Sequence, residues 1–462
     1  MRIRRFGTGF LLLLVLALAS SAFLASAAFY SRVSVEDYER LGLPVLNVNT
    51  YGRKINSKEN YLDAVYTLDA EGMHWGGGCK IRGRGNSTWK TIDTSKKPYL
   101  LKLDEAEALL GMGTARRWVL KASATDKSFL RDEYAFFLAR SIWNRFAWTP
   151  RQRFVTLLIN GKYAGLYGLQ EKIEVSPERV DIEPADGSIL FKIDEHRNEQ
   201  FSFTSNHGVL FNIVDTDGVS YSWDDFFAIQ DFVNGRERWL YGEQDGRAEA
   251  PSWGEAAARE EAASWGEAPS WGEAAEREDA AAPAETMEQG AGNDWTSYFD
   301  LDSFVDWYLV NEFTKNHDSR FQASCFISYD GKQDKFFMGP VWDFDLSSGN
   351  TDAAGCSKSD GYITAQAFWY ERLLQDELFM TALRSRWAAT KDELAASIDA
   401  IQGWADELED AAVLNDRVWK SFGHRQWPNP SGWRKRKRYQ DEIDYMVAYL
   451  RARLAWLESQ WG

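Results

Sequence analysis

Short apolar runs bounded by turn residues occupy much of the first half of the chain. Strand-like runs cover Tyr99–Leu103 and Phe154–Ile159. Asn160-Gly161 then leads into another apolar run, Tyr163–Leu169, and this combination is typical of a β-hairpin. Residues 127–146 instead carry apolar side chains spaced mostly by three or four, which predicts an amphipathic helix between these strands.

The second half of the chain is mostly of helical period. A helix is predicted through Phe304 and Tyr308, followed by two short strands that end at Val341-Trp342. From about Ala367 to the C-terminus the apolar spacing predicts helices. With strand-like runs mainly in the first half and helical periods mainly in the second, we expect an α+β protein.

Residues 242–294 differ in composition from the segments on both sides. The sequence Ser-Trp-Gly-Glu-Ala occurs three times, beginning at Ser252, Ser264 and Ser270, among Ala, Glu and Gly. With hardly any aliphatic side chain the segment cannot form a core, and we expect a low-complexity acidic insertion. The repeated Trp residues could alternatively dock on a partner.

The N-terminus has the pattern of an export signal. Basic residues in Met1–Arg5 precede an apolar run from Phe10 that continues to Ala28, and Ala25-Ser26-Ala27 has the form of a cleavage site. Residues 1–28 are therefore predicted to be a signal peptide or an uncleaved membrane anchor. Either would place the protein outside the cytoplasm, and residues 10–28 could associate with a membrane.

Composition narrows the functional classes. The 462 residues carry a formal charge of −16, which disfavours nucleic acid as a partner. The three Cys residues are too few for a zinc ribbon or a disulfide framework, and whether Cys325 and Cys356 pair stays open. One basic run, Arg434–Arg438, is either a solvated face or a contact for an acidic substrate or anionic lipid.

Two acidic motifs carry the densest candidate chemistry. Asn316-His317-Asp318 and Asp343-Phe344-Asp345 flank the predicted hairpin, which can bring their carboxylates to one edge of a sheet. Carboxylates in this arrangement suit a magnesium ion, and one of them can accept a proton from a hydroxyl nucleophile. Asp at such positions can also simply cap a turn.

Basic residues upstream could contact phosphates. Arg84 lies in a glycine-containing turn, Ile81–Trp89, and Lys97 and Lys102 lie before and within a predicted strand. Each could equally be a turn or surface residue. The chain has no Walker loop, no Gly-x-Ser-x-Gly elbow and no His-Glu-x-x-His, which disfavours P-loop enzymes, serine hydrolases of that type and zincins.

Taken together, six segments make the chain resemble the CotH kinase family, an atypical branch of the protein-kinase fold. In order these are Ile81–Trp89, Lys97–Leu103, Phe129–Asp132, Gly161–Tyr167, Thr314–Asp318 and Gly339–Asp345. The resemblance implies phosphorylation of protein Ser or Thr hydroxyls with ATP and Mg²⁺ or Mn²⁺. It also implies two lobes: an N-lobe over residues 45–175 with an antiparallel sheet and a helix, and a mainly helical C-lobe over residues 176–241 and 295–462.

The resemblance also implies roles for individual residues. Asp318 would be the catalytic aspartate, Asp343 would hold the metal, and Asp345 is a further possible ligand. Lys102 would bind the ATP phosphates, with Lys97 as the alternative and Arg84 in the donor-rich turn. Glu133 would pair with the lysine, although the same helix offers Asp132, and Glu171 would lie near a hinge that meets adenine.

Departures from the family pattern leave other functions open. Ala323 stands where ordinary kinases have a metal-binding Asn, so either Gln322, Ser324 or Asn316 replaces it or a second metal is not held. One alternative is a non-catalytic surface or envelope protein that keeps the kinase-like scaffold for assembly or adhesion. Another is transfer of AMP or glutamate at the same nucleotide site.

Overall fold

The structure, a computed structural model, describes residues 33–85, 87–90, 96–197, 199–243 and 294–462. The predicted signal peptide or anchor lies outside the described residues. So does the predicted acidic insertion, apart from residues 242, 243 and 294.

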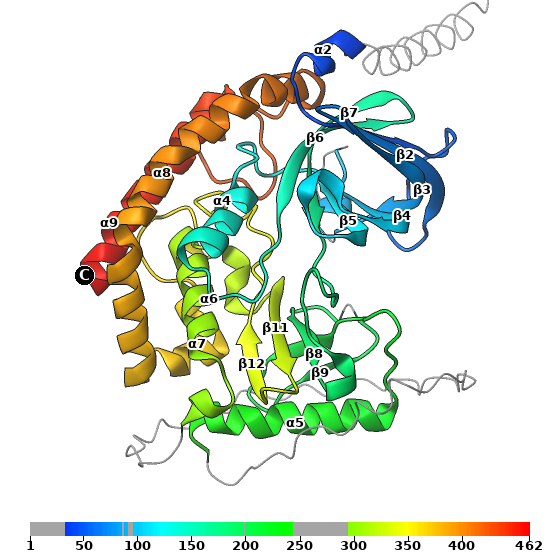
Figure 1. The fold of residues 1–462 in the computed structure, drawn as a ribbon. Helices are drawn as coiled ribbons and strands as arrows, with labels where there is room; N and C mark the ends of the chain where they lie inside the picture. Colours follow the sequence, from blue (N-terminus) through cyan, green and yellow to red (C-terminus); the bar gives the residue numbers. More distant parts are fainter. Residues whose placement is uncertain (1–32, 86, 91–95, 198, 244–293) are drawn as a thin grey trace, which may run out of the picture.

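A closed barrel forms the N-terminal part of the molecule (Figure 1). Its strands follow the order β1-β2-β3-β4-β5-β7-β6. Their bounds are β1 Val45–Asn49, β2 Leu62–Ala70, β3 Met73–Gly83, β4 Tyr99–Glu107, β5 Ala115–Lys121, β6 Gln152–Ile159 and β7 Lys162–Glu171. The predicted hairpin is confirmed, because β6 and β7 pair antiparallel with Ile159 opposite Lys162.

The barrel corrects the expectation of an antiparallel sheet in one respect, because one of its strand pairings is parallel. β1 pairs antiparallel with β2 and parallel with β6, so the first strand closes the sheet on itself. Closure removes the sheet edges that would otherwise present unpaired backbone groups. The short β1 carries no motif that distinguishes an edge strand from a closing strand, so the sequence pattern alone did not reveal this pairing.

Side-chain alternation along β5 decides which side chains point out of the barrel. Trp118 and Leu120 are fully buried in the barrel core, whereas Val119 belongs to the second core outside it. Successive side chains of a strand point to opposite faces. The side chain of Lys121, the last residue of β5, therefore points out of the barrel on the same face as that of Val119.

A second, five-stranded antiparallel sheet lies in the C-terminal part, in the order β12-β11-β8-β10-β9. Its bounds are β8 Ile189–Ile193, β9 Ser202–Thr204, β10 Leu210–Ile213, β11 Cys325–Asp330 and β12 Lys335–Met338. The two strands predicted to end at Val341-Trp342 are β11 and β12, and β12 ends earlier, ahead of Gly339-Pro340. This region is therefore less purely helical than predicted.

Helices surround the second sheet and run along one side of the molecule (Figure 1). They are α2 Val35–Glu39, α3 Ser87–Lys90, α4 Arg131–Phe137, α5 Trp223–Tyr241, α6 Leu301–Thr314, α7 Phe368–Leu373, α8 Glu377–Trp419 and α9 Tyr439–Trp461. The helix predicted near residues 127–146 is α4, which continues as a π-helical turn over Leu138–Ile142. Within the described part of the chain, no helix has the length and apolarity needed to cross a membrane.

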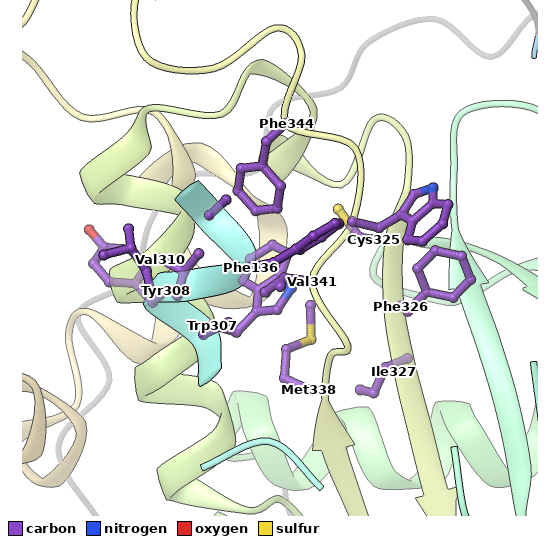
Figure 2. Packing of buried hydrophobic residues seen from close by; sticks show 14 of the residues in the cluster. Phe136, Trp307, Tyr308, Val310, Cys325, Phe326, Ile327, Met338, Val341 and Phe344 are labelled. Carbon is purple, nitrogen blue, oxygen red and sulfur yellow. The ribbon is translucent and has the colours of Figure 1, made fainter. Parts of the chain in front are cut away.

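One large hydrophobic core joins α4 to the second sheet and the long helices. Figure 2 shows Phe136 of α4 among Trp307 of α6, Val341 and Phe344. The rings of Phe136 and Phe344 meet edge to face, 6.4 Å apart. The apolar Phe of the Asp-Phe-Asp motif is thus anchored in the core, which fixes the two aspartates on either side of it.

The second core also buries an acid, Glu237 of α5, whose Oε1 accepts hydrogen bonds from Ser205 Oγ at 3.0 Å and Trp369 Nε1 at 2.7 Å. Burial raises the pKa of Glu237 from its ordinary value of 4.5 to about 7. The folded chain therefore holds this proton more tightly than the unfolded chain, and stability falls as the pH rises from about 4.5 through about 7.

We expect Glu237→Gln, which keeps the acceptor oxygen but carries no charge, to be more stable than the wild type at pH 8.5, by up to about 3 kcal/mol. The two proteins should be similar at pH 4.5, where both side chains are uncharged. Thermal unfolding at both pH values measures the difference. Glu371→Gln, at an exposed position, is the control, and an equal pH dependence in wild type and Glu237→Gln would contradict the expectation.

Candidate functional site

A cavity of about 660 Å³ opens where the barrel meets the second sheet. Its walls come from the turn after β3, the segment after β5, the ends of β7 and β8, the start of β11, the Asp-Phe-Asp motif and the loop between α8 and α9. Charged side chains of both signs line it, among them Arg84, Lys121, Asp318, Asp343 and Asp345.

Lys121 is the central cation of the cavity wall. Its Nζ lies 2.9 Å from Asp132 Oδ2 and 3.8 Å from Asp345 Oδ1, and it donates a hydrogen bond to Asp343 Oδ1. Burial alone would lower the pKa of Lys121, but the three carboxylates raise it well above its ordinary value. The lysine is therefore firmly charged in the folded protein.

Asp132 connects the lysine to the Asp-Phe-Asp motif. It lies in the first turn of α4, is buried, and accepts a hydrogen bond from the backbone N–H of Phe344 at 2.6 Å through Oδ1. Its Oδ2 meets Lys121. Since one carboxylate holds both the lysine and the backbone between Asp343 and Asp345, the position of α4 sets the geometry of the cation and of both acids.

The two acids of the motif have opposite protonation behaviour. Burial would raise the pKa of Asp343, but Lys121 and then Arg84 lower it to about 2. Burial raises the pKa of Asp345 to about 7; Lys121 opposes this rise and the neighbouring Asp343 and Asp132 add to it. Asp343 is therefore a permanent anion, whereas Asp345 needs a further cation nearby to be fully ionised at neutral pH.

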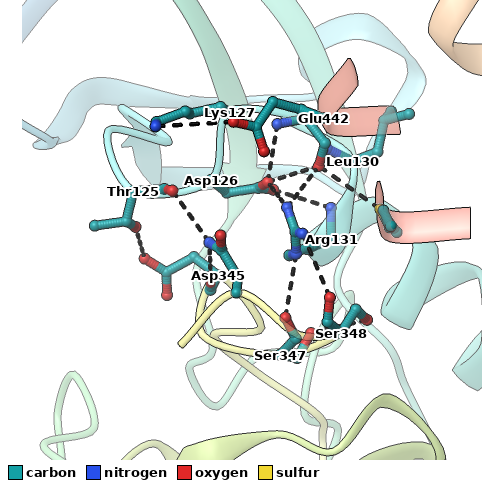
Figure 3. A network of polar contacts seen from close by, with 12 residues as sticks. Thr125, Asp126, Lys127, Leu130, Arg131, Asp345, Ser347, Ser348 and Glu442 are labelled. Carbon is teal, nitrogen blue, oxygen red and sulfur yellow. Dashed lines mark hydrogen bonds and ion pairs between the residues drawn. The ribbon is translucent and has the colours of Figure 1, made fainter. Parts of the chain in front are cut away.

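A second polar network supports the segment after the motif (Figure 3). The buried guanidinium of Arg131 contacts Asp126 Oδ1 at 2.5 Å and donates to the backbone oxygens of Ser347 at 3.1 Å and Ser348 at 3.4 Å. Thr125 Oγ1 donates to Asp345 Oδ2 at 2.6 Å. The segment after β5 and the segment after the motif are thus tied together, which restricts how far either can move from Lys121.

Asp318 approaches the cavity from a different element. It lies in the 3₁₀ turn His317–Arg320, which Asn316 caps. His317 Nδ1 lies 3.0 Å from Asp318 Oδ1. Burial raises the pKa of Asp318, the hydrogen bond to His317 opposes that rise, and the charges of Asp343 and Asp194 add to it. A carboxylate whose proton affinity is raised in this way is suited to accept a proton.

The donor set fits a hard divalent cation. Asp343 and Asp345 both face the cavity, and Ser324 Oγ lies 3.3 Å from Asp343 Oδ2. Magnesium is commonly bound by one or two carboxylates, with phosphate and water oxygens as the remaining ligands. In the described ranges, no three or more His, Cys, Asp or Glu side chains are arranged as a metal cluster by themselves. The two aspartates would therefore hold such an ion together with a bound phosphate.

The structure brings four of the eight sequence-predicted site residues to the cavity: Arg84, Asp318, Asp343 and Asp345. Lys102, Lys97, Glu133 and Glu171 are not among its lining residues.

Lys102 lies opposite Lys80 and Arg117 on neighbouring strands of the barrel, while its neighbours Leu101 and Leu103 point into the barrel core. Lys97 Nζ donates to the backbone oxygen of Trp89 at 3.1 Å.

The two glutamates have structural partners instead. Glu133 contacts Arg140 at 2.7 Å, so on α4 it is Asp132, the alternative, that meets the lysine. Glu171 is fully buried and contacts Arg151 at 2.9 Å and the N–H of Gly113 at 2.8 Å. Its neighbours Lys172 and Ile173, not Glu171 itself, line the cavity.

Sequence reasoning missed Lys121, although a signal for it exists. Trp118-Val119-Leu120-Lys121 has the same apolar-then-lysine form as Tyr99-Leu100-Leu101-Lys102. It is also the strand directly before α4, so its lysine is the one next to the helix that carries Asp132. Choosing the strand adjacent to the helix would have selected Lys121.

The fold and the site define a mixed α+β protein in which one buried lysine joins three aspartates beside a polar cavity. A family model described as CotH kinase protein matches residues 81–253 and 256–457. The chain belongs to the CotH kinase protein family, which confirms the resemblance seen in its motifs. Membership implies an atypical kinase-like function that uses ATP and a protein substrate. A search of curated proteins gave no match.

Proposed function

We propose that this protein is an atypical protein kinase that transfers the γ-phosphoryl group of ATP to Ser or Thr hydroxyls of a protein substrate. The observation that carries the proposal is the contact of Lys121 with Asp132, Asp343 and Asp345 at the wall of one cavity, with Asp318 in the same wall. A scaffold used only for assembly has no physical need for such a buried charge set, because burying charges is costly unless they are paired.

In this proposal the cationic side chains hold the phosphates. Lys121 and Arg84 would contact the ATP phosphates. Burial lowers the pKa of Arg84, and the charges of Asp343 and Asp132 oppose that change. Two apolar residues, Ile173 after β7 and Val214 after β10, line the cavity and offer a surface for the purine base. Lys121 replaces Lys102 in the phosphate-binding role.

Asp318 would position the acceptor hydroxyl and take its proton. The acceptor oxygen forms a bond to the γ-phosphorus, the bond from that phosphorus to the bridging oxygen of the β-phosphate breaks, and ADP leaves with the electron pair. Asp343 and Asp345 would hold Mg²⁺ or Mn²⁺, which when bound neutralises phosphate charge. Positioning and charge neutralisation supply most of the catalysis in such transfers.

We also propose that the protein acts outside the cytoplasm, because residues 1–28 have the form of an export signal. ATP is scarce there, so the kinase would act in a compartment that contains nucleotide or before its export.

Labelled ATP tests the proposed reaction directly. The purified protein, a hydroxyl-rich acceptor protein and Mg²⁺ or Mn²⁺ are incubated with ATP labelled at the γ- or the α-phosphate. We expect label from the γ-position only, and at least about 100-fold less for Asp343→Asn. Asp399→Asn is the control, since Asp399 is exposed and pairs with Arg451 on the surface.

Mass spectrometry of the acceptor identifies the added group. Label from the α-phosphate would show transfer of AMP, and an added glutamate would show glutamylation; either would replace the kinase proposal. Absence of any adduct with several acceptor proteins would favour the non-catalytic alternative.

A further inference from the structure

The loop between α8 and α9, residues 420–438, reaches the mouth of the cavity. Trp427 and Pro428 line the cavity wall. The Trp427 side chain is nevertheless about half exposed, at 52%. A large aromatic surface is therefore available where an acceptor segment has to enter.

Hydrogen bonds to the site hold the first half of this loop in place. Asn429 Nδ2 donates to the backbone oxygen of Thr125 at 2.8 Å, and the Thr125 hydroxyl in turn contacts Asp345. Lys127 Nζ donates to the backbone oxygen of His424 at 2.7 Å. Trp427 lies between these two anchors in the sequence, so its place at the cavity mouth is defined by the same segment that supports the Asp-Phe-Asp motif.

The second half of the loop folds back beside the first. The backbone N–H of Gly423 donates to the carbonyl oxygen of Arg436 at 2.7 Å. Arg436 itself is buried, contacts Glu442 at 2.9 Å and lies over the ring of Tyr445. The basic run predicted from the sequence is thus attached to the part of the loop that reaches the cavity.

Most of the basic side chains of this loop are exposed and uncompensated. We define the basic loop surface as Arg425, Arg434, Lys435 and Lys437, all of which are exposed. In the part of the chain that the structure describes, none of the four lies within ion-pair distance of a carboxylate.

The nearby acids are already engaged. Asp441 pairs with Arg438 at 2.7 Å. Asp416 caps Ser421 and Phe422 through their backbone N–H groups, and Asp352 accepts from the N–H of Ser431 at 2.9 Å. Exposed basic side chains without a paired carboxylate, on a chain with a net charge of −16, favour the binding of an anionic partner.

We propose that the basic loop surface and Trp427 dock an acidic, extended segment of the acceptor protein beside the hydroxyl that is phosphorylated. This inference rests on the proposed kinase function and adds a substrate class to it. The basic side chains would contact Glu or Asp residues of the acceptor, and Trp427 would pack against its chain. The basic loop surface belongs to the same loop as Trp427, which lines the cavity. An extended peptide that follows this loop can enter the cavity, whereas a lipid headgroup layer cannot.

A peptide with one Ser flanked by Glu residues tests this docking, together with its counterpart in which Gln replaces Glu. Binding of fluorescent peptides to the full chain is measured by anisotropy without nucleotide. The variant Arg434→Glu/Lys435→Glu/Lys437→Glu should bind the Glu peptide on the order of tenfold more weakly. The wild-type affinity should fall with added salt. Arg40→Glu/Lys54→Glu/Lys162→Glu changes the net charge equally at exposed positions after α2, between β1 and β2 and on β7, and should bind like the wild type.

Kinetics separate docking from chemistry. With γ-labelled ATP, the loop variant should show a higher KM for the Glu peptide, an unchanged kcat, and unchanged kinetics with the Gln peptide. Trp427→Ala should weaken the binding of both peptides. A Glu peptide that binds through the loop surface but receives no label would support docking and count against the kinase proposal.

The opposite results overturn the docking proposal and leave the kinase proposal intact. One such result is that the wild type and the loop variant bind the Glu peptide with the same affinity and phosphorylate it with the same KM. Another is a loop variant that binds the peptide normally but no longer binds vesicles containing phosphatidylserine, which would assign the surface to anionic lipid.

Discussion

Lys121→Met is expected to lower phosphoryl transfer by about 10² to 10³-fold. The substitution removes the cation that would contact the ATP phosphates and leaves Asp132, Asp343 and Asp345 facing one another without it. Removing one partner of a buried ion pair costs on the order of 3–5 kcal/mol of stability. The melting temperature should therefore fall as well, although Met fills most of the space of the lysine stem.

The loss of stability should be larger at pH 8 than at pH 5.5. Burial raises the pKa of Asp345 to about 7 and also raises the pKa of Asp132. The charge of Lys121 opposes both rises. Without Lys121 these groups take up protons more readily at the lower pH, which relieves their mutual repulsion. Thermal unfolding at the two pH values measures this effect.

Lys102→Met is the matched control, because it makes the same chemical change on the neighbouring strand outside the cavity. We expect its phosphoryl transfer and its nucleotide binding to stay within about twofold of the wild type, as for most surface substitutions. Loss of activity in Lys102→Met with retention in Lys121→Met would return the phosphate-binding role to Lys102 and reject the assignment made from the geometry.

Asp318→Asn is expected to abolish transfer without weakening nucleotide binding. A positioned general base contributes about 10² to 10⁴-fold to a proton transfer, and the amide keeps the shape of the side chain but has a very low affinity for a proton. Because Asp318 lies on its own 3₁₀ turn and its carboxylate pairs with His317, the phosphate and metal contacts should remain. The measurements are the rate of γ-phosphoryl transfer and, separately, the affinity for a non-hydrolysable ATP analogue with Mg²⁺.

His317→Ala helps to separate orientation from proton acceptance. It removes the hydrogen bond to Asp318 Oδ1, which lowers the pKa of that acid, but leaves the carboxylate in place. We expect a smaller loss of rate than in Asp318→Asn and a shift of the pH profile toward higher pH. Full activity of Asp318→Asn would refute the role of Asp318 as the base, and an equal loss of nucleotide affinity would show that it binds ATP rather than the acceptor.

Much of the candidate site follows from motifs that can be read in the sequence. Asp318 and Asp343 lie at opposite ends of a short hairpin, and antiparallel pairing of β11 with β12 returns the chain to the same edge of the sheet. Arg84 lies in a glycine-rich turn that the sequence marks as donor-rich, and the structure places it in the cavity wall.

The lysine shows where sequence reasoning stops. Tyr99–Lys102 and Trp118–Lys121 have nearly the same local pattern, so propensity and alternation treat Lys102 and Lys121 alike. What separates them is that β5, and not β4, leads directly into α4, so that Lys121 lies next to the helix that carries Asp132. A similar argument applies to Asp132 and Glu133, which are adjacent on α4 but point in different directions.

The amino-acid sequence by itself determined the family, the α+β class, the hairpins and helices, and the acidic motifs, because these depend on local pattern and on the order of short segments. Only the tertiary structure decided that the first sheet closes into a barrel, that Asp132 and not Glu133 meets Lys121 beside the Asp-Phe-Asp motif, and that the loop after α8 brings Trp427 to the cavity. Each of these depends on contacts between residues far apart in the chain, whose free energy comes from burial and charge pairing that no local pattern encodes.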